Sequence, residues 1–225
     1  GLFPAQSRGD DVDVDTGAGP ATLHFLRQQV DKPVERPDFC LDDFVAPAES
    51  GKQDWIGAFA CTAGIGIDER VARYEADHDD YNAILLKSLA DRLAETLAER
   101  LHQRVRMEFW GYASDESLSV DDIIGEKYRG IRPAPGYPAC PEHSEKATLF
   151  QLLSATDNAA MTLTDNFAML PAASVSGWYF SHPKSQYFVV GRVSKEQAED
   201  YARRKGLTLA QAERLLAANL DYDPE

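Results

Sequence analysis

Hydrophobic residues recur at every fourth position through the middle of the chain. Between Asp68 and Trp110 there is neither proline nor glycine, and the apolar stripe consists of Tyr81, Leu85, Leu89, Leu93, Leu97, Leu101, Val105 and Phe109. A spacing of four drifts slowly around a helix of 3.6 residues per turn, so the stripe winds across the helix face. Ala90, Ala94 and Ala98 broaden the stripe on one side. The pattern predicts one long core helix or two consecutive ones. The acidic stretch 75–80 is expected at or near the start of the more strongly patterned part of this helical region, since negative charge suits a helix N-terminus.

Shorter runs on both sides of this helix indicate strands. Residues 11–14 alternate with period two, 21–26 form a second candidate, 54–67 contain a buried strand that runs into glycines, and 161–169 are partly extended. Residues 174–183 and 186–193 are rich in β-branched and aromatic side chains and flank a short polar turn, which predicts a hairpin.

Helix signals complete the pattern. Residues 119–130 contain a short helix that stops at a glycine, and 141–153 fit a helix with Pro141 in its first turn. Ser194 with Gln197, and Thr208 with Gln211, resemble capping boxes that open two closing helices. We therefore expect one α+β domain over residues 1–225, with antiparallel strands and one dominant helix.

The composition narrows the function classes. The 225 residues carry a formal net charge of -14, which argues against a general nucleic-acid or anionic-membrane surface. No apolar run approaches the roughly 18 residues of a membrane-spanning helix, and the start lacks a signal-peptide pattern. The three cysteines are odd in number and widely spaced, which argues against a disulfide framework. This cysteine usage favours a protein of the reducing cytoplasm. The segment 31–38 is a charged, proline-broken connection.

A stiff loop is the main candidate for chemistry. The segment 132–143, RPAPGYPACPEH, holds four prolines and can be neither a central strand nor a helix interior. Arg132 could present its guanidinium fork to a carboxylate, and Ala134 and Gly136 could bring bare backbone groups close to a ligand. Tyr137 offers a ring face for stacking. The alternative is an Arg–Asp ion pair that locks a structural loop.

Two other motifs are weaker. Cys140 and His143 could be a zinc pair or a nucleophile with its base, but no second ligand pair exists, and a buried cysteine beside a capping or core histidine accounts for them as well. The glycines of 64–66 lack the third glycine and the βαβ unit of a dinucleotide fingerprint, so turn glycines are the better interpretation.

Long motifs resemble one known family. GIRPAPGYPACPEHSEKATLF and FAMLPAASVSGWYFSHPKSQYFVVGRV are similar to the reactivation domain of cobalamin-dependent methionine synthase. The likeness extends through HDDYNAILLKSLADRLAETLAERLHQRVRMEFWGYA and SGKQDWIGAFA, and it includes the opening GLFPAQSRGDDVDV and the closing DYARRKGLTLAQAERLLAANLDYD. Nearly the whole chain is covered, with the motifs in the expected order.

The resemblance implies a C-shaped mixed domain with a largely antiparallel twisted sheet, a long central helix and C-terminal helices. It further implies that the domain binds S-adenosylmethionine and supports the reductive remethylation of inactive cob(II)alamin. The electron would come from flavodoxin or a flavoprotein reductase, and the cobalamin from a neighbouring domain of an enzyme that transfers a methyl group from methyltetrahydrofolate to homocysteine.

The same resemblance assigns residues. Arg132 would grip the methionine carboxylate, with backbone atoms of Ala134 and Gly136 and the side chain of Tyr137 holding the rest of the ligand. Glu126 would favour the cationic sulfonium end. Tyr187 and Phe188 match the other ligand-contact positions, for which ordinary sheet aromatics are the alternative. No residue of this chain is expected to be catalytic in its own right, and none to bind a metal, because the methyl transfer asks the protein to orient reactants.

The chain also departs from the family. A helical segment that precedes GLFPA in the family, and that carries an acidic ligand contact, is absent from this sequence. Loss of one charge-assisted hydrogen bond would cost about 1.5–3 kcal/mol of binding. The competing function is therefore a docking or scaffold fragment that no longer binds the ligand. An independent Cys–His hydrolase is a third possibility, which the sequence supports little.

Overall fold

The computed structural model describes residues 1–17, 19–30 and 37–224, so most of the predicted connection at 31–38 lies outside the described residues. Its centre is an antiparallel sheet of five strands in the order β3-β2-β1-β4-β7. The strands are β1 (Leu2–Arg8), β2 (Asp11–Asp15), β3 (Pro20–His24), β4 (Asp54–Thr62) and β7 (Ser174–Tyr179). A separate pair joins β5 (Thr162–Leu163) to β6 (Met169–Leu170). The predicted α+β class with an antiparallel sheet is confirmed.

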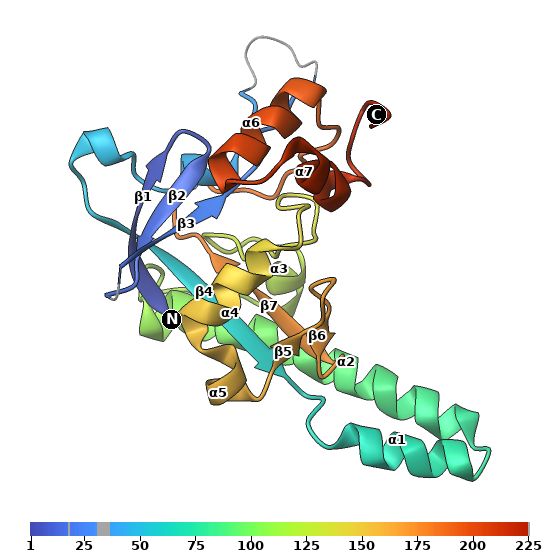
Figure 1. Ribbon diagram of the computed structural model, residues 1–225. Coiled ribbons are helices and arrows are strands. Elements are labelled where there is room, and N and C mark those ends of the chain that lie inside the picture. Colours follow the sequence, from blue (N-terminus) through green and yellow to red (C-terminus); the bar gives the residue numbers. More distant parts are fainter. Residues whose placement is uncertain (18, 31–36, 225) are drawn as a thin grey trace.

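The central helical prediction is confirmed as two helices. α1 (Ile67–Ala76) and α2 (Asp80–Arg104) form an arm that projects from the body (Figure 1). Asp79 caps α2 by accepting a hydrogen bond from the backbone N–H of Asn82 at 3.1 Å, so the acidic stretch does open the longer helix. A π-helical turn, η3 (Val105–Phe109), follows α2 directly.

The expectation that the leucine stripe is core is wrong. Leu89 is 53 % exposed and Leu93 63 %, whereas the buried α2 residues are Ala83, Ala90, Ala94, Ala98 and His102. The reason is steric: α2 packs across β4 and β7, and small side chains allow the helix backbone to lie close to the sheet. The large residues of the stripe therefore face outward along most of the arm.

The predicted hairpin is also wrong in its second strand. β7 forms as expected, but residues 186–193 contain no strand. The free edge of β7 is taken by the proline-rich segment instead, because Trp178 N–H donates to the Pro133 carbonyl at 2.9 Å and Ile131 forms a bridge with Phe180. Tyr187 and Phe188 thus lie on a segment without regular secondary structure beside that loop rather than in the sheet.

The remaining helices sit around the sheet. α3 (Val120–Ile124) ends at Gly125, a glycine within the predicted segment 119–130. The prediction that Pro141 lies in the first turn of the next helix is wrong, because α4 (Glu145–Leu153) begins at the N-cap Ser144, after Pro141. α5 (Ala155–Ala159), α6 (Lys195–Lys205) and α7 (Leu209–Leu216) follow, and the short 3₁₀ turns are η1 (Leu41–Phe44) and η2 (Ala48–Ser50). Thr208 and Gln211 form a complete capping box. Ser194 caps α6, but the Gln197 side chain donates to the Arg27 carbonyl.

The cores follow this arrangement. The main core lies between the sheet and α4, around Trp178, Phe25 and Leu149. A second core joins α6 and α7 to Val190 and Val193, and a third joins α2 to Phe59 and Tyr179. Among the helices in the described residues, none is both long and apolar enough to cross a membrane.

Candidate functional site

The segment 132–143, called the proline loop below, is fixed at both ends. At its start, Ile131 and Pro133 bond to the end of β7. At its centre, Gly136 N–H donates to the Cys140 carbonyl at 2.7 Å, and Cys140 N–H donates to the Tyr137 carbonyl at 2.8 Å. The loop is therefore a closed turn with its own hydrogen bonds, as its proline content predicted.

The far end of the loop is held by a buried ion cluster. The carboxylate of Glu142 accepts hydrogen bonds from Tyr201 at 2.9 Å and Lys205 at 3.0 Å, both on α6, and from the Ser144 hydroxyl at 2.6 Å. Lys205 also pairs with Glu145. Burial alone would raise the pKa of Glu142, but Lys205 and Ser144 outweigh it and hold this pKa below its ordinary value.

One cavity lies beside the proline loop. Its volume is about 470 Å³, within the range of small-molecule sites. Six of the seven residues predicted to contact a ligand line it: Glu126, Arg132, Ala134, Tyr137, Tyr187 and Phe188. Gly136 does not line it. The walls are completed by Phe59 of β4, Val175 of β7 and Glu95 of α2, so segments far apart in the chain meet there.

Arg132 combines the two alternatives that its sequence context left open. Its Nη2 donates to the Glu99 carboxylate of α2 at 2.7 Å, which is an ion pair, yet the side chain also lines the cavity. Its Nε is buried without a hydrogen-bond partner. Burial opposes the guanidinium charge, and Glu99 more than compensates, so the pKa of Arg132 is raised above its usual value. The guanidinium is thus fully charged, and Glu99 takes up only part of its hydrogen-bonding capacity.

The backbone of Arg132 ties the loop to the segment that the hairpin prediction misplaced. Its N–H donates to the Tyr187 hydroxyl at 3.0 Å, and Val190 N–H donates to the Pro138 carbonyl at 2.9 Å. Tyr187 and Phe188 therefore reach the cavity because their segment runs along the loop, whichever secondary structure it adopts.

Two glutamates escaped the sequence analysis. Glu95 lines the cavity and Glu99 pairs with Arg132. Residues four apart share a helix face, so the pair Glu95 and Glu99 was the available signal. It was overlooked because the leucine stripe had been assigned to the core, which made this face seem solvent-exposed. Together Glu95, Glu126 and Arg132 give the cavity two carboxylates and one guanidinium.

Glu126 has an unusual backbone. Its φ is 53°, in the left-handed region that a residue with a side chain rarely occupies, directly after the α3 cap Gly125. Its N–H donates to the Ile123 carbonyl at 3.0 Å, which closes the helix end. A non-glycine residue held in this conformation beside a cavity is a common feature of ligand-contact positions.

Glycines allow the close approaches that shape the site. A Cβ on Gly177 of β7 would lie 2.7 Å from the Pro133 carbonyl oxygen and 3.0 Å from Phe59. Gly136, with φ 96°, faces His143, and a Cβ there would lie 2.6 Å from Nδ1 of its ring and closer still to Cε1. Gly136 thus supports the loop from behind, which explains its absence from the cavity wall.

Cys140 and His143 do not form a reactive pair. His143 faces Gly136, and its Nδ1 lies 2.7 Å from Nζ of Lys146. Cys140 is buried, and burial together with Glu145 and Glu142 raises the pKa of its thiol well above the ordinary value. The thiol stays protonated at neutral pH, so the structure favours the buried-cysteine interpretation.

This burial gives a direct prediction for all three cysteines, which are free and buried. Burial raises the pKa of Cys61 to about 11, and a thiol with that pKa holds far less thiolate at neutral pH than an exposed one. We expect alkylation by iodoacetamide at pH 7 to be at least about tenfold slower in the native chain than in urea-unfolded chain, measured by mass spectrometry. Rapid native labelling of Cys140 would contradict this and would reopen the nucleophile hypothesis.

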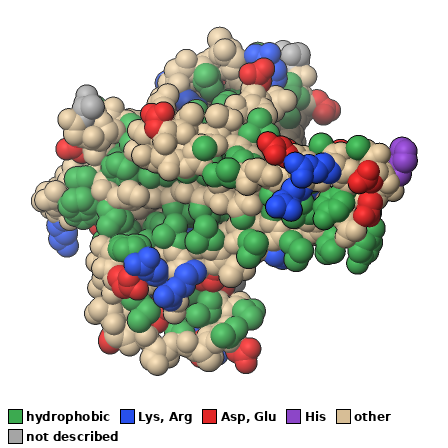
Figure 2. Space-filling view, turned by 90° about the horizontal axis from the view of Figure 1, so that it is seen from below, with side chains coloured by type: hydrophobic (Ala, Val, Ile, Leu, Met, Phe, Trp, Pro, Cys, Tyr) green, Lys and Arg blue, Asp and Glu red, His purple; other side chains and the backbone are tan. Residues whose placement is uncertain are grey.

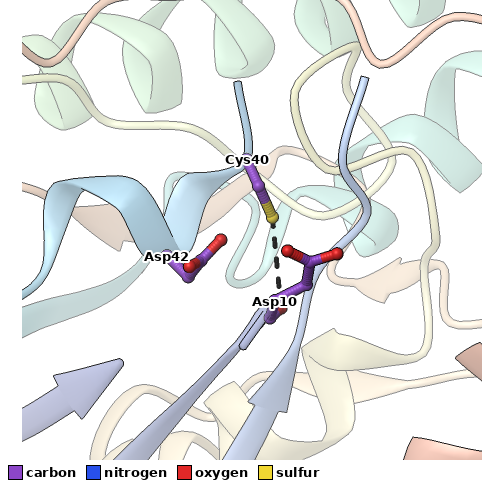
Figure 3. Close-up of side chains that lie close together, drawn as sticks. All are labelled: Asp10, Cys40 and Asp42. Carbon is purple, nitrogen blue, oxygen red and sulfur yellow. Dashed lines mark hydrogen bonds between the residues drawn. The ribbon is translucent and has the colours of Figure 1, made fainter. Parts of the chain in front are cut away.

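A further cluster lies away from the cavity. Side-chain donor atoms of Asp10, Cys40 and Asp42 lie within 4.8 Å of one another (Figure 3), the one group with metal-ligand spacing among the described residues. Arg27 already bridges it, donating to Asp10 at 2.8 Å and to Asp42 at 3.0 Å. Burial raises the pKa of Asp42 to about 6 and that of the Cys40 thiol well above its usual value. The Arg27 guanidinium therefore supplies the counter-charge of both carboxylates.

Comparison with known proteins gives two matches. Residues 1–206 match the family model described as vitamin B12 dependent methionine synthase, activation domain. Among solved structures, a MetH reactivation domain bound to AdoHcy is similar, with 55 % sequence identity and a TM-score of 0.95. The match covers 99 % of this chain and 70 % of that chain.

Proposed function

Because the chain belongs to the family of vitamin B12-dependent methionine synthase activation domains, we propose that the cavity beside the proline loop binds S-adenosylmethionine. The observation that carries this proposal is the convergence of six predicted ligand residues on one cavity of about 470 Å³. The solved relative at 55 % identity was crystallised with AdoHcy, the demethylated form of the same molecule.

The charges of the cavity suit this ligand. S-adenosylmethionine carries one carboxylate, one ammonium and one sulfonium group. The lining supplies one guanidinium, Arg132, and two carboxylates, Glu95 and Glu126, so each ligand charge has a possible opposite partner. We assign Arg132 to the ligand carboxylate, because Glu99 binds only Nη2 of the guanidinium and Nε has no hydrogen-bond partner.

The remaining contacts are apolar or from the backbone. Ala134 and Pro133 approach β7 closely at Gly177, so the loop presents its main chain to the cavity with little side-chain bulk. The ring of Tyr137 is 61 % exposed at the rim, where it can cover a bound molecule. Tyr187 and Phe188 also line the cavity.

The ligand supplies the chemistry when bound, since its sulfonium methyl group is an electrophile. The residues of this chain hold and orient it, and none of the cavity residues needs to transfer a proton. Orientation alone is a large contribution in a two-reactant methyl transfer. The finer proposal is that this domain presents the ligand to the cobalamin domain of a methionine synthase for reductive remethylation, with the electron from flavodoxin or a flavoprotein reductase.

Calorimetry tests the binding proposal. We expect the chain to bind S-adenosylmethionine, and Glu126→Gln to weaken this binding about two- to fivefold, the size of a partly exposed charge interaction. Binding of S-adenosylhomocysteine, which lacks the sulfonium charge, should change little. Equal weakening for both ligands would remove the sulfonium role from Glu126.

The docking or scaffold alternative has one observation in its favour. Glu99 already occupies Nη2 of Arg132, as it would in a cavity that has no ligand to hold. This alternative predicts that calorimetry detects no binding heat when either ligand is added to the 225 residues. It also predicts no binding heat after the upstream segment of the family is added to the chain. Heat that returns with that segment would favour an incomplete binding site.

A further inference from the structure

The C-terminal end of α2 reverses the arrangement seen along the arm. Hydrophobic side chains gather on the surface of the arm (Figure 2), where Leu89 and Leu93 are each more than half exposed. By contrast, His102 in the last turn of α2 and Arg106 in η3 are completely buried. A π-helical turn such as η3 is rare and is often found at functional sites. The polar side chains that turn inward here therefore call for an explanation.

Arg106 is held in one orientation. Its Nε and Nη2 donate to the two carboxylate oxygens of Glu116, each at 2.7 Å, and the Glu116 side chain is only 6 % exposed. The guanidinium carbon lies 4.3 Å from the centre of the Tyr128 ring. A buried bidentate pair fixes geometry, whereas apolar side chains of similar volume often give as much stability. The pair thus directs attention to Tyr128, the ring that it supports.

Tyr128 lies between two cavity residues in the sequence, Glu126 and Arg132. Its side chain is only 9 % exposed, whereas Lys127 and Arg129 on either side of it are exposed. Tyr128 does not line the cavity itself. The buried ring therefore anchors a segment whose two ends contribute an acidic and a basic side chain to the cavity.

His102 connects the Tyr128 ring to a further cavity residue. The two rings meet edge to face with centroids 4.9 Å apart, and His102 also stacks on Tyr179 at 5.1 Å. Tyr179 stacks in turn on Phe59, which lines the cavity, at 4.8 Å. Burial, and then the charge of Arg106, lowers the pKa of His102 to about 2, so this imidazole is neutral at physiological pH. The column of rings therefore carries no charge of its own.

The Tyr128 hydroxyl gives a second connection, through Tyr187. Burial, and then the interaction with Tyr187, which includes a hydrogen bond between the two side chains, raises the pKa of Tyr128, so its hydroxyl keeps the proton at neutral pH. The Tyr187 hydroxyl accepts a hydrogen bond from Arg132 N–H at 3.0 Å. A path of hydrogen bonds thus leads from Tyr128 to the backbone of the residue assigned to the ligand carboxylate.

We propose that Tyr128 is a positioning residue of the S-adenosylmethionine site: Arg106 and His102 hold its ring, and its hydroxyl fixes Arg132 beside the cavity through Tyr187. This inference rests on the proposed function, because it assigns the ligand carboxylate to Arg132. Tyr128 acts on the ligand only through its neighbours, since it does not line the cavity.

Tyr128→Phe tests this proposal, because it keeps the ring and removes the hydroxyl. We expect the Arg132 amide proton to exchange at least threefold faster in the ligand-free variant, measured by NMR. We also expect S-adenosylmethionine binding to weaken about three- to tenfold in calorimetry, the effect of one lost hydrogen bond. Tyr112→Phe is the matched control, because the Tyr112 hydroxyl is buried near Gly130 and has no hydrogen-bond partner among the described residues. It should leave both quantities unchanged.

A double-mutant cycle separates positioning from general stabilisation. In a Tyr187→Phe background, Tyr128→Phe should weaken binding no further, because its effect passes through the Tyr187 hydroxyl. Equal losses in both backgrounds would overturn the proposal, and so would unchanged exchange at Arg132. A Tyr128→Phe chain that does not fold would also overturn it, since the hydroxyl would then serve folding. The exchange measurement needs no ligand. A wild-type chain that binds no S-adenosylmethionine would therefore refute the proposed function, while exchange at Arg132 would still decide whether Tyr128 holds that residue.

Discussion

Replacing Gly136 with alanine is expected to destabilise the domain by about 2–5 kcal/mol, as the sum of two costs. The φ of 96° disfavours any residue with a Cβ by about 1–2 kcal/mol. The new methyl group would also press on the His143 ring, where overpacking costs about 1–3 kcal/mol more. Urea unfolding followed by circular dichroism measures the change. We also expect weaker ligand binding, because the loop must move away from His143 toward the cavity.

Gly206→Ala is the matched control. Gly206 has φ 70° and nothing within 4 Å of its would-be Cβ, so this variant reports the backbone cost alone. Gly136→Ala should be the more damaging of the two by the overpacking cost. Equal destabilisation would show that the loop does not press on His143, and the account of Gly136 as a support behind the cavity would fail.

Replacing Arg132 with alanine is expected to weaken S-adenosylmethionine binding roughly 10- to 150-fold, the equivalent of about 1.5–3 kcal/mol for a lost charge-assisted hydrogen bond. Loss of the guanidinium leaves the ligand carboxylate without its proposed partner. It also frees Glu99, whose charge then repels that carboxylate. Calorimetry on the wild-type chain and the variant gives the ratio directly.

Two controls separate binding from folding. Arg100→Ala removes an exposed guanidinium from the same region of α2 and should leave affinity unchanged. The double variant Arg132→Ala with Glu99→Gln should recover part of the loss, because the uncompensated carboxylate is removed as well. Equal affinity of wild-type and Arg132→Ala chains would refute the role assigned to this residue.

Local signals predicted much of the fold. The acidic stretch 75–80 was expected to open the long helix, a glycine to end the helix in 119–130, and Thr208 to cap the last one, and the structure has Asp79, Gly125 and Thr208 at these ends. Caps depend mainly on neighbouring residues. The alternation at 11–14 likewise gave β2. These features need no knowledge of what packs against them, which is why a single sequence suffices for them.

Packing partners were the part that the sequence did not reveal. The leucine stripe has the period of a buried face and Ala90, Ala94 and Ala98 broaden it on one side, but only the alanine side packs on the sheet, and periodicity alone cannot rank the two sides. The hairpin failed for a similar reason, since the proline loop occupies the β7 edge that residues 186–193 would need. Both errors concern competition for one surface between segments far apart in the chain.

The loop residues of the candidate site could be named from the sequence, whereas the residues that α2 contributes could not. Arg132, Ala134 and Tyr137 share one short loop, and the family resemblance added Glu126, Tyr187 and Phe188, all of which line the cavity. Glu95 and Glu99 come from α2, and only the way α2 crosses the sheet brings them to Arg132. Their roles could not follow from a sequence in which that crossing was unknown.

The buried cluster of Lys205, Glu142 and Glu145 has a consequence for the distant end of the chain. It fastens α6 to the loop that shapes the cavity, although α6 does not line that cavity. Breaking such a cluster by removing one partner is costly, because buried carboxylates lose their counter-charge. Opening of the C-terminal helices and loosening of the loop should therefore occur together. A bound ligand would then protect α6 from proteolysis, although the ligand does not contact α6.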